Sequence, residues 1–278
     1  DGAMRDFRNK AAFVTGGASG IGLALGRALG RAGARVMLAD IEAAALDSAV
    51  ADLRASGVAA QGVVCDVADA ASVQRAAART LEAFGAIHIL CNNAGVGGGS
   101  GVDAISLDTW RWVVDVNLMG VVHGIAAFLP HMLAQGEGHI VNTASLAGLQ
   151  ANIGFSPYVA SKYGVVGISE GLAVELKDRG VGVSVICPGF VRTRIPTSAR
   201  NRPGRYGAAT KPSPGSRGAA ILAHVAERNE AGIDPDFVAG RAMEAMRDDE
   251  LYVFTNPDMR DEVYERLDAI RAALDRAD

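Results

Sequence analysis

A tyrosine and a lysine, Tyr158 and Lys162, stand four residues apart in a stretch of helical character, so both side chains lie on one face. A phenol titrates near pH ~10 and is a poor base at neutral pH. An ammonium group about 4 Å away would bring its pKa to about 7 at an effective dielectric constant of about 20. The pair therefore predicts a tyrosine that exchanges protons near working pH. The adjacent Tyr163 lies about 100° around the helix from Lys162 and is the poorer candidate.

Two further polar residues are candidates for the same chemistry. Ser145 precedes Tyr158 by 13 residues, so a loop can return its hydroxyl to the phenol. Asn117 can bind a water molecule or stabilise a break in a helix. The structural alternatives are a turn residue for Ser145 and a hydrogen-bonded core amide for Asn117.

A glycine-rich turn, TGGASGIG at residues 15–22, directly follows the first apolar run and opens the first helical stretch. Glycines let the backbone turn tightly and approach a pyrophosphate, and the helix start offers free N–H groups to the anion. The alternative is a crowded strand–helix junction that needs glycine for packing alone. The residues of the turn expected to bind a dinucleotide are Gly16, Ser19, Gly20, Ile21 and Gly22.

An acidic residue, Asp40, ends the second apolar run. Its carboxylate can accept both ribose hydroxyls of an adenosine, whereas a 2′-phosphate about 4 Å away would be repelled by about 1–4 kcal/mol. No Arg or Lys stands in the glycine turn or directly after Asp40 to offset this repulsion. The expected cofactor is therefore NAD rather than NADP. The alternative role of Asp40 is to cap the helix that follows.

Loops after the next two runs complete the expected cofactor site. Asp66 and Val67 end the third run, where the carboxylate can bond an adenine amino group or simply turn the chain. Asn93, Ala94 and Gly95 follow the fourth run, where small residues let the backbone lie against a cofactor. A plain turn is the alternative there as well.

These residues lie where short β-branched runs meet longer Ala- and Leu-rich runs. The short runs are continuously apolar, as expected when helices cover both faces of a parallel sheet. Their alternation predicts an α/β fold: a Rossmann-type, doubly wound parallel sheet of about seven strands with helices on both faces, in one domain over residues 1–278. The predicted strands are residues 11–15, 35–39, 61–66, 87–91, 139–143, 181–187 and 251–254. The predicted helices are residues 20–32, 42–56, 70–84, 107–134 with a break, 157–179 and 235–247.

Composition limits the function classes. The chain has 278 residues, of which 49% are hydrophobic and 21% charged, which excludes a disordered or fibrous protein. Its formal charge of −4 argues against nucleic acid as a partner. The three cysteines lack metal-ligand spacing, so the expectation is no metal and buried free thiols in a reducing compartment. With no secretory signal in this sequence, the expected location is the cytoplasm.

One uncharged stretch, residues 116–135, is long enough to span a bilayer. Polar residues interrupt it, and Pro130 is expected to break its helix. A buried helix at the core or at a subunit interface explains the stretch better, so no membrane contact is expected.

The composition changes at residues 192–217, which hold seven cations, four prolines and no acidic residue. Pro and Gly at the tip predict a mobile loop, and residues 192–218 are expected to form a lid over the substrate. The alternative is that these cations form an anion-binding site. Residues 255–278 are predicted as a C-terminal helical extension that packs on its own subunit or on a neighbour. Its apolar stripe is Val263, Leu267, Ile270 and Leu274.

With these residues in view, the chain resembles the short-chain dehydrogenase/reductase family over roughly residues 7–193. The resemblance implies that Tyr158 is the acid–base for hydride exchange between an alcohol and nicotinamide. The matching motifs, in family order, are Thr15-Gly16-x-x-x-Gly20-Ile21-Gly22, Asp66, Asn92-Asn93-Ala94-Gly95, Asn117, Ser145, Tyr158-x-x-x-Lys162 and Pro188-Gly189-x-x-x-Thr193.

The same resemblance implies roles for the other residues. Ser145 binds the substrate oxygen, Lys162 lowers the tyrosine pKa and holds the nicotinamide ribose, and Asn117 holds a water molecule of a proton relay. Family members usually form homotetramers or homodimers, which the uncharged helix at 116–135 would suit. The residues implied to line the nicotinamide are Pro188, Gly189, Val191 and Thr193.

The expected substrate is a hydrophobic secondary alcohol or its ketone, because the candidate pocket walls are apolar or aromatic. The C-terminal half also resembles, more weakly, bacterial dehydrogenases of bulky aryl alcohols. Because the lid carries cations, a carboxylated or phosphorylated substrate is the alternative. The alternative functions are a non-catalytic NAD-binding regulator on the same fold and a sugar-nucleotide epimerase or dehydratase. The candidate walls are Leu146, Ala147, Ile153, Phe155, Phe190 and Tyr206.

Overall fold

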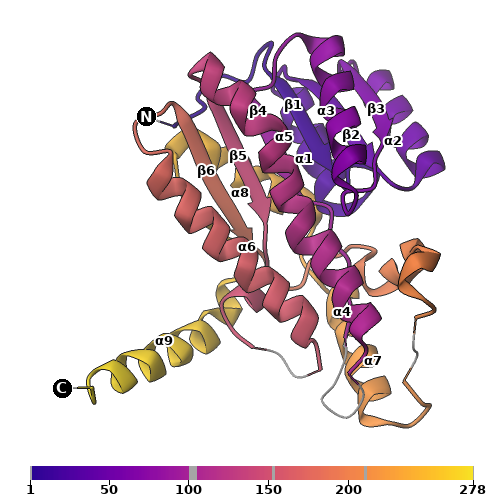
Figure 1. The fold of residues 1–278 in the computed structure, drawn as a ribbon, viewed down its shortest axis with the longest axis vertical. Coiled ribbons are helices and arrows are strands. Elements are labelled where there is room, and N and C mark those ends of the chain that lie inside the picture. The colour runs from indigo at the N-terminus through magenta and orange to yellow at the C-terminus, as the bar shows by residue number, and fades with distance from the viewer. Residues whose placement is uncertain (1, 100–104, 152–153, 210–211, 278) are drawn as a thin grey trace.

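The computed structural model describes residues 2–99, 105–151, 154–209 and 212–277. Within these residues seven strands form one parallel sheet in the order β3-β2-β1-β4-β5-β6-β7. Helices lie on both sides of this sheet (Figure 1), so the predicted doubly wound α/β fold is confirmed. The strands are β1 Ala11–Thr15, β2 Arg35–Asp40, β3 Ala60–Val64, β4 Ile89–Asn92, β5 Gly138–Thr143, β6 Val181–Cys187 and β7 Tyr252–Phe254.

The core has two layers, one on each face of the sheet. Ala12 and Val14 of β1 pack under helices of one layer, and their neighbours Ala11 and Phe13 pack under the other. Because alternate side chains are buried on opposite faces, the strands read as continuous apolar runs. The first layer holds α1 Gly20–Arg31, α2 Ala43–Ala55 and α8 Pro235–Asp248; the second holds α3 Ala70–Phe84, α5 Gly120–Gln135 and α6 Ser156–Glu175. The expected buried free thiols are Cys65, Cys91 and Cys187.

The long uncharged helix is interrupted, but not at the predicted residue. Helix α4 (Leu107–Val114) passes through a π-helical turn, η1 (Asp115–Met119), into α5. Pro130 lies inside α5, so the expected break there is wrong. Ala126 and Pro130 are both exposed, so the carbonyl that loses its N–H donor lies on the solvent side, where water can satisfy it.

The continuous helical stretch Leu107–Gln135 has the length and composition of a membrane span, with 44% of its most apolar window buried. In this fold its second half packs on α3 and on strands β4 and β5. The burial of Phe128 and Met132 against the sheet accounts for the apolar composition.

The segment between β6 and α8 is more structured than the sequence predicted. It contains two 3-10 turns, η3 (Ile195–Asn201) and η4 (Gly204–Tyr206), and a helix, α7 (Arg217–Glu230), in a span where no helix was predicted. Ser216 caps α7 by accepting a hydrogen bond from the N–H of Ala219. Asn229 is the buried residue of α7, so this helix contributes no apolar side chain to the buried core.

The C-terminal extension follows a short turn, η5 (Pro257–Met259), as helix α9 (Arg260–Leu274). Figure 1 shows α9 projecting away from the sheet. Its stripe is open to solvent, with Leu267 49% and Leu274 67% exposed, so the helix does not bury this face on its own subunit. The expected homo-oligomer stays a prediction.

Candidate active site

The glycine turn has the backbone that its sequence predicts. Gly16 and Gly20 have φ values of +63° and +53°, in the left-handed region that favours glycine. A Cβ on Gly22 would lie 2.1 Å from the carbonyl oxygen of Gly16, so only glycine fits where α1 begins. The turn therefore holds the start of α1 close to the end of β1.

The start of α1 has open N–H groups. Ser19 stands at its N-cap without a side-chain cap, whereas Asp69 and Ser106 cap α3 and α4. The first N–H groups of a helix have no intrahelical partner, and they carry the positive end of its dipole. This uncapped start, reached through a glycine turn, fits the pyrophosphate of a dinucleotide.

Asp40 lies beside this turn at the end of β2. Its Oδ2 accepts a hydrogen bond from the N–H of Ala18 at 3.0 Å, and its Oδ1 accepts one from the N–H of Glu42 at 3.0 Å. The side chain therefore braces the glycine turn and the approach to α2. The alternative role of capping the helix is wrong, because the N-cap of α2 is Glu42. A carboxylate has further acceptor positions, so these bonds leave it able to accept ribose hydroxyls.

Asp66, at the end of the third strand unit, meets a residue of the lid. Its Oδ2 accepts a hydrogen bond from Arg205 Nη2 at 2.7 Å, and its Oδ1 accepts one from the N–H of Ala68 at 3.0 Å. The neighbouring Val67 is buried. It packs so closely on Gly120 that a Cβ on that glycine would lie 2.9 Å from the Val67 side chain. Arg205 therefore lies at the edge where the sequence places the adenine.

The loop after β4 is tied to the glycine turn by Thr15. The hydroxyl of Thr15 accepts from the N–H of Asn93 at 2.9 Å and from that of Ala94 at 3.0 Å. Asn93 Nδ2 also donates to the carbonyl of Thr15 at 3.1 Å. Sequence reasoning gave Thr15 no such role, although its place at the strand end before a glycine was a usable signal. Gly95 completes the loop near Asn117 and Lys162.

Ser145 and Tyr158 meet across the loop that joins β5 to α6. Ser145 precedes a 3-10 turn, η2 (Leu146–Gly148), and its Oγ accepts from the N–H of Ala147 at 3.1 Å. Tyr158 stands in the first turn of α6, directly after Pro157. The Ser145 hydroxyl donates to the carbonyl of Pro188 at 3.4 Å and lies near enough to the Tyr158 phenol to act on its pKa, as the loop length predicts.

Lys162 lies on the same face of α6 as Tyr158. Its ammonium is 5.6 Å from the centroid of the Tyr158 ring and donates to the carbonyl of Thr143 at 2.8 Å. The side chain is only 3% exposed. The structure therefore holds the lysine, the phenol and the Ser145 hydroxyl at one end of β5.

The pKa of Tyr158 moves opposite to the sequence-based prediction. Burial raises it, and the hydrogen bond with Ser145 opposes this rise. Burial also lowers the pKa of Lys162 to about 8. Low-dielectric surroundings disfavour both charged forms, and the ammonium bonds a carbonyl rather than the phenol. The two groups are therefore neighbouring buried titratable side chains that both favour their neutral forms.

Asn117 lies inside the π-helical turn η1 and is 1% exposed. Its Oδ1 accepts from the N–H of Val96 at 2.8 Å, and its Nδ2 donates to the carbonyl of Val96 at 3.0 Å. Nδ2 also donates to Ser161 Oγ at 3.2 Å, and that hydroxyl donates to the carbonyl of Tyr158 at 2.7 Å. Asn117 therefore ties the helix bearing the tyrosine to the loop after β4, and Ser161 is a positioning residue that sequence reasoning missed.

The loop after β6 is held by residues far away in the chain. The carbonyl of Pro188 accepts from the N–H of Leu146 at 2.9 Å, and Asn256 Oδ1 accepts from the N–H of Gly189 at 2.9 Å. Asn229 of α7 donates to the carbonyl of Thr193 at 2.8 Å. Val191 is buried and bridges to Ile233. Asn229 and Asn256 had no sequence signal, because neither belongs to a motif.

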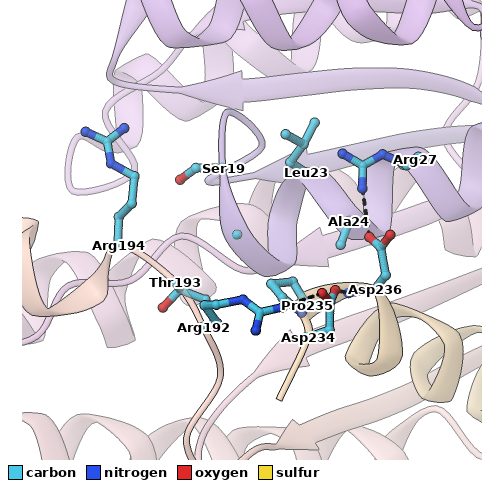
Figure 2. Close-up of a pocket in the computed structure, with 11 residues that line it drawn as sticks. Ser19, Leu23, Ala24, Arg27, Arg192, Thr193, Arg194, Asp234, Pro235 and Asp236 are labelled. Carbon is cyan, nitrogen blue, oxygen red and sulfur yellow. Dashed lines mark hydrogen bonds and ion pairs between the residues drawn. The ribbon is translucent and has the colours of Figure 1, made fainter. Parts of the chain in front are cut away.

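A cavity of about 470 Å³ opens beside the glycine turn, lined by Ser19, Gly20, Leu23, Ala24, Arg27, Arg192, Thr193, Arg194, Asp234, Pro235 and Asp236. It meets the expected cofactor residues at Ser19, Gly20 and Thr193 and does not reach Tyr158. In Figure 2 Arg192 and Arg27 turn toward Asp234 and Asp236, with ion-pair distances of 2.7 and 2.8 Å. Arg194 points away from these carboxylates.

The expected substrate walls fall into two groups. Tyr206 is buried in an apolar cluster with Val96, Trp112 and Val113, and Tyr158 packs against this cluster. Its hydroxyl donates to Asp115 Oδ2 at 2.8 Å. Leu146 and Ala147 are buried in the turn after Ser145, Phe155 is half-buried, and Phe190 lies under Arg228 of α7. Ile153 lies outside the described residues.

Trp112 was not among the predicted walls, although an aromatic residue near the expected helix start was a usable signal. It lies under the guanidinium of Arg202, 5.3 Å from its ring centroid, so the lid rests on it. Among the described residues no group of three or more His, Cys, Asp or Glu side chains is placed to hold a metal ion.

Comparison with known proteins agrees with this geometry. The family model described as short chain dehydrogenase matches residues 10–204. A C alpha-dehydrogenase of a Sphingobium species is 34% identical over 269 residues, 96% of this chain and 87% of the relative. A cyclohexanol dehydrogenase of an Acinetobacter species is 37% identical over 190 residues, 68% of this chain and 76% of that enzyme. A short-chain dehydrogenase/reductase from Burkholderia phymatum, solved in complex with NAD, is 38% identical with a TM-score of 0.93 over 97% of both chains.

Proposed function

The chain belongs to the short-chain dehydrogenase/reductase family and is an oxidoreductase, and we propose that it interconverts a hydrophobic secondary alcohol and its ketone with NAD. The observation that carries the proposal is the meeting of Ser145, Tyr158 and Lys162 at one end of β5. Thr143 at the end of β5 donates to Asn93, which is bonded to the glycine turn, so the reactive end adjoins the expected dinucleotide site.

The proposed mechanism assigns the proton to Tyr158. A bound nicotinamide dinucleotide supplies or accepts the hydride. In reduction the phenol of Tyr158 donates its proton to the carbonyl oxygen, and in oxidation the phenolate removes the proton of the alcohol. Ser145, which lies near the phenol, holds the substrate oxygen beside it. Lys162 exchanges a proton with the tyrosine inside their buried pair.

The proposed cofactor residues are those of the glycine turn and the strand ends. The uncapped start of α1 would hold the pyrophosphate, Asp40 the ribose of the adenosine, and Asp66 the adenine. The carboxylate of Asp40 supports NAD over NADP by charge repulsion. The NAD bound to the Burkholderia phymatum relative supports the same choice.

The proposed substrate class rests on the apolar surroundings of Tyr158. Trp112, Val113 and Tyr206 form a packed cluster against the tyrosine, and Val96 joins them. Such a wall favours an alicyclic or aryl substrate over a polar one. The name of the cyclohexanol dehydrogenase relative supports an alicyclic secondary alcohol.

The direct test is nicotinamide absorbance with purified protein, NAD or NADP, and aryl, alicyclic, steroid and acidic secondary alcohols. We expect turnover with NAD, fastest for apolar alcohols. Turnover with NADP alone would contradict the cofactor assignment, and turnover confined to acidic alcohols would contradict the substrate class. Dinucleotide binding without turnover across the panel would favour the non-catalytic regulator.

The pH dependence should differ in sign between the two directions. The Tyr158–Lys162 pair loses its first proton near the Lys162 pKa of about 8. Because this first proton comes from Lys162, the neutral lysine can accept the proton that Tyr158 passes on in oxidation, whereas the charged lysine can reprotonate Tyr158 in reduction. We therefore expect the initial rate of alcohol oxidation to rise as the pH passes about 8, and that of ketone reduction to fall over the same range. Rates that change in the same direction would contradict this assignment.

A further inference from the structure

Glu42 of the segment that leads into α2 holds two arginines of the lid. Arg200 Nη2 donates to its Oε1 at 2.5 Å and Arg200 Nε at 3.2 Å, while Arg194 Nη1 lies 3.6 Å from its Oε2. Asn201 Nδ2 also donates to Oε1 at 2.8 Å. The contacts between Arg200 and Glu42 join residues 158 positions apart in the chain. They bring two cations to the side of the site where Asp40 lies.

We infer that Glu42 is a second determinant of the preference for NAD over NADP, because it neutralises Arg194 and Arg200 next to the proposed ribose site. This inference rests on the proposed function. The N–H of Glu42 donates to Asp40 Oδ1 at 3.0 Å, so both acids belong to the edge that a ribose 2′-phosphate would approach. Two arginines facing two carboxylates leave no net positive charge there.

Three other cations among the described lid residues have partners: Arg192, Arg202 and Arg205. Arg192 pairs with Asp234 at 2.7 Å and Arg205 with Asp66 at 2.7 Å. Arg202 donates to the carbonyls of Tyr206 and Gly207. Arg194 and Arg200 share the single carboxylate of Glu42, so the loss of its charge would leave two cations beside Asp40 alone, a net excess of one positive charge.

Arg200 would stay in place without the charge of Glu42. Its Nη1 donates to the carbonyl of Arg194, the N-cap of η3, at 3.2 Å and to Thr197 Oγ1 within η3 at 3.1 Å. The side chains of Arg200 and Glu42 are only 28% and 23% exposed, so salt screens their charges less than it would on an open surface. Arginine also binds phosphate through two parallel N–H bonds.

The test compares the affinities for NADH and NADPH of wild type, Glu42→Gln, Arg200→Gln and Asp47→Asn, measured by fluorescence and calorimetric titration. Gln keeps the shape of Glu42 and removes its charge. We expect Glu42→Gln to raise NADPH affinity about tenfold and to change NADH affinity by less than about threefold. NADPH should also raise the Tm of Glu42→Gln by more than it raises the Tm of wild type.

The controls separate charge from lid loosening. Arg200→Gln breaks the same ion pair but removes the cation, so it should not improve NADPH binding. Asp47→Asn removes an exposed acid of α2 and should leave both affinities unchanged. An unchanged NADPH-to-NADH ratio in Glu42→Gln, or an equal gain in Arg200→Gln, would overturn the inference while leaving the proposed function standing. A wild type that binds neither dinucleotide would refute the proposed function, and the inference with it.

Discussion

Tyr158→Phe should reduce kcat by about 10²–10⁴-fold in both reaction directions, the contribution expected of one positioned acid–base. The substitution removes a single oxygen atom, the one that lies near the Ser145 hydroxyl. The ring keeps its packing against the cluster of Trp112, Val113 and Tyr206, so the fold should be retained. The measurement is kcat from nicotinamide absorbance, with NADH affinity measured on the same samples.

The matched control is Tyr163→Phe, on the same helix. Tyr163 lies under Arg266 of α9, 5.0 Å from its ring centroid, and is not part of the Ser145–Tyr158–Lys162 group. Its variant should keep kcat within about threefold of wild type, well below the effect of losing an acid–base. A Tyr158→Phe enzyme that keeps more than about a tenth of its activity would exclude Tyr158 as the proton carrier.

Lys162→Met should lower kcat on the order of 100-fold, because it removes the ammonium that shares protons with Tyr158. The carbonyl of Thr143 also loses its buried donor, at a cost of about 1–3 kcal/mol of stability. With Lys162 gone only the tyrosine titrates, and burial raises its pKa. The alkaline rise of the oxidation rate should therefore move to higher pH than in wild type.

This shift distinguishes a role in proton exchange from a merely structural one. A structural loss would lower the rate at every pH and leave the inflection in place. Lys177→Met, just beyond the end of α6 and exposed, serves as the control and should match wild type in rate and pH profile. A Lys162→Met enzyme with an unchanged inflection would show that the pair does not titrate as a unit.

Much of the fold could be read from the sequence because its signals are local. The predicted helix at residues 70–84 coincides with α3, whose N-cap Asp69 accepts a hydrogen bond from Ala71. The glycine turn needs left-handed backbone at Gly16 and Gly20, which few other residues adopt. The spacing of Tyr158 and Lys162 places both on one helix face wherever the helix lies. These features depend on neighbours within a few residues.

Other features depended on burial and on distant partners, and there sequence reasoning failed. Pro130 was expected to end its helix, but its place on the exposed side of α5 made the lost hydrogen bond tolerable. Helix α7 went unpredicted because it buries little. The pKa of Tyr158 was expected to fall, but the interior around it favours the neutral phenol.

Short-range spacing and backbone conformation specify the doubly wound sheet, the glycine turn and the residues offered for proton transfer, so the amino-acid sequence was enough to predict them. Only the tertiary structure decided which charges face each other. No spacing rule links Glu42 to Arg200 or Asp66 to Arg205, which are 158 and 139 positions apart. Those pairs exist because the lid folds back over the carboxyl ends of the strands, and an ion pair depends on distance in space rather than along the chain.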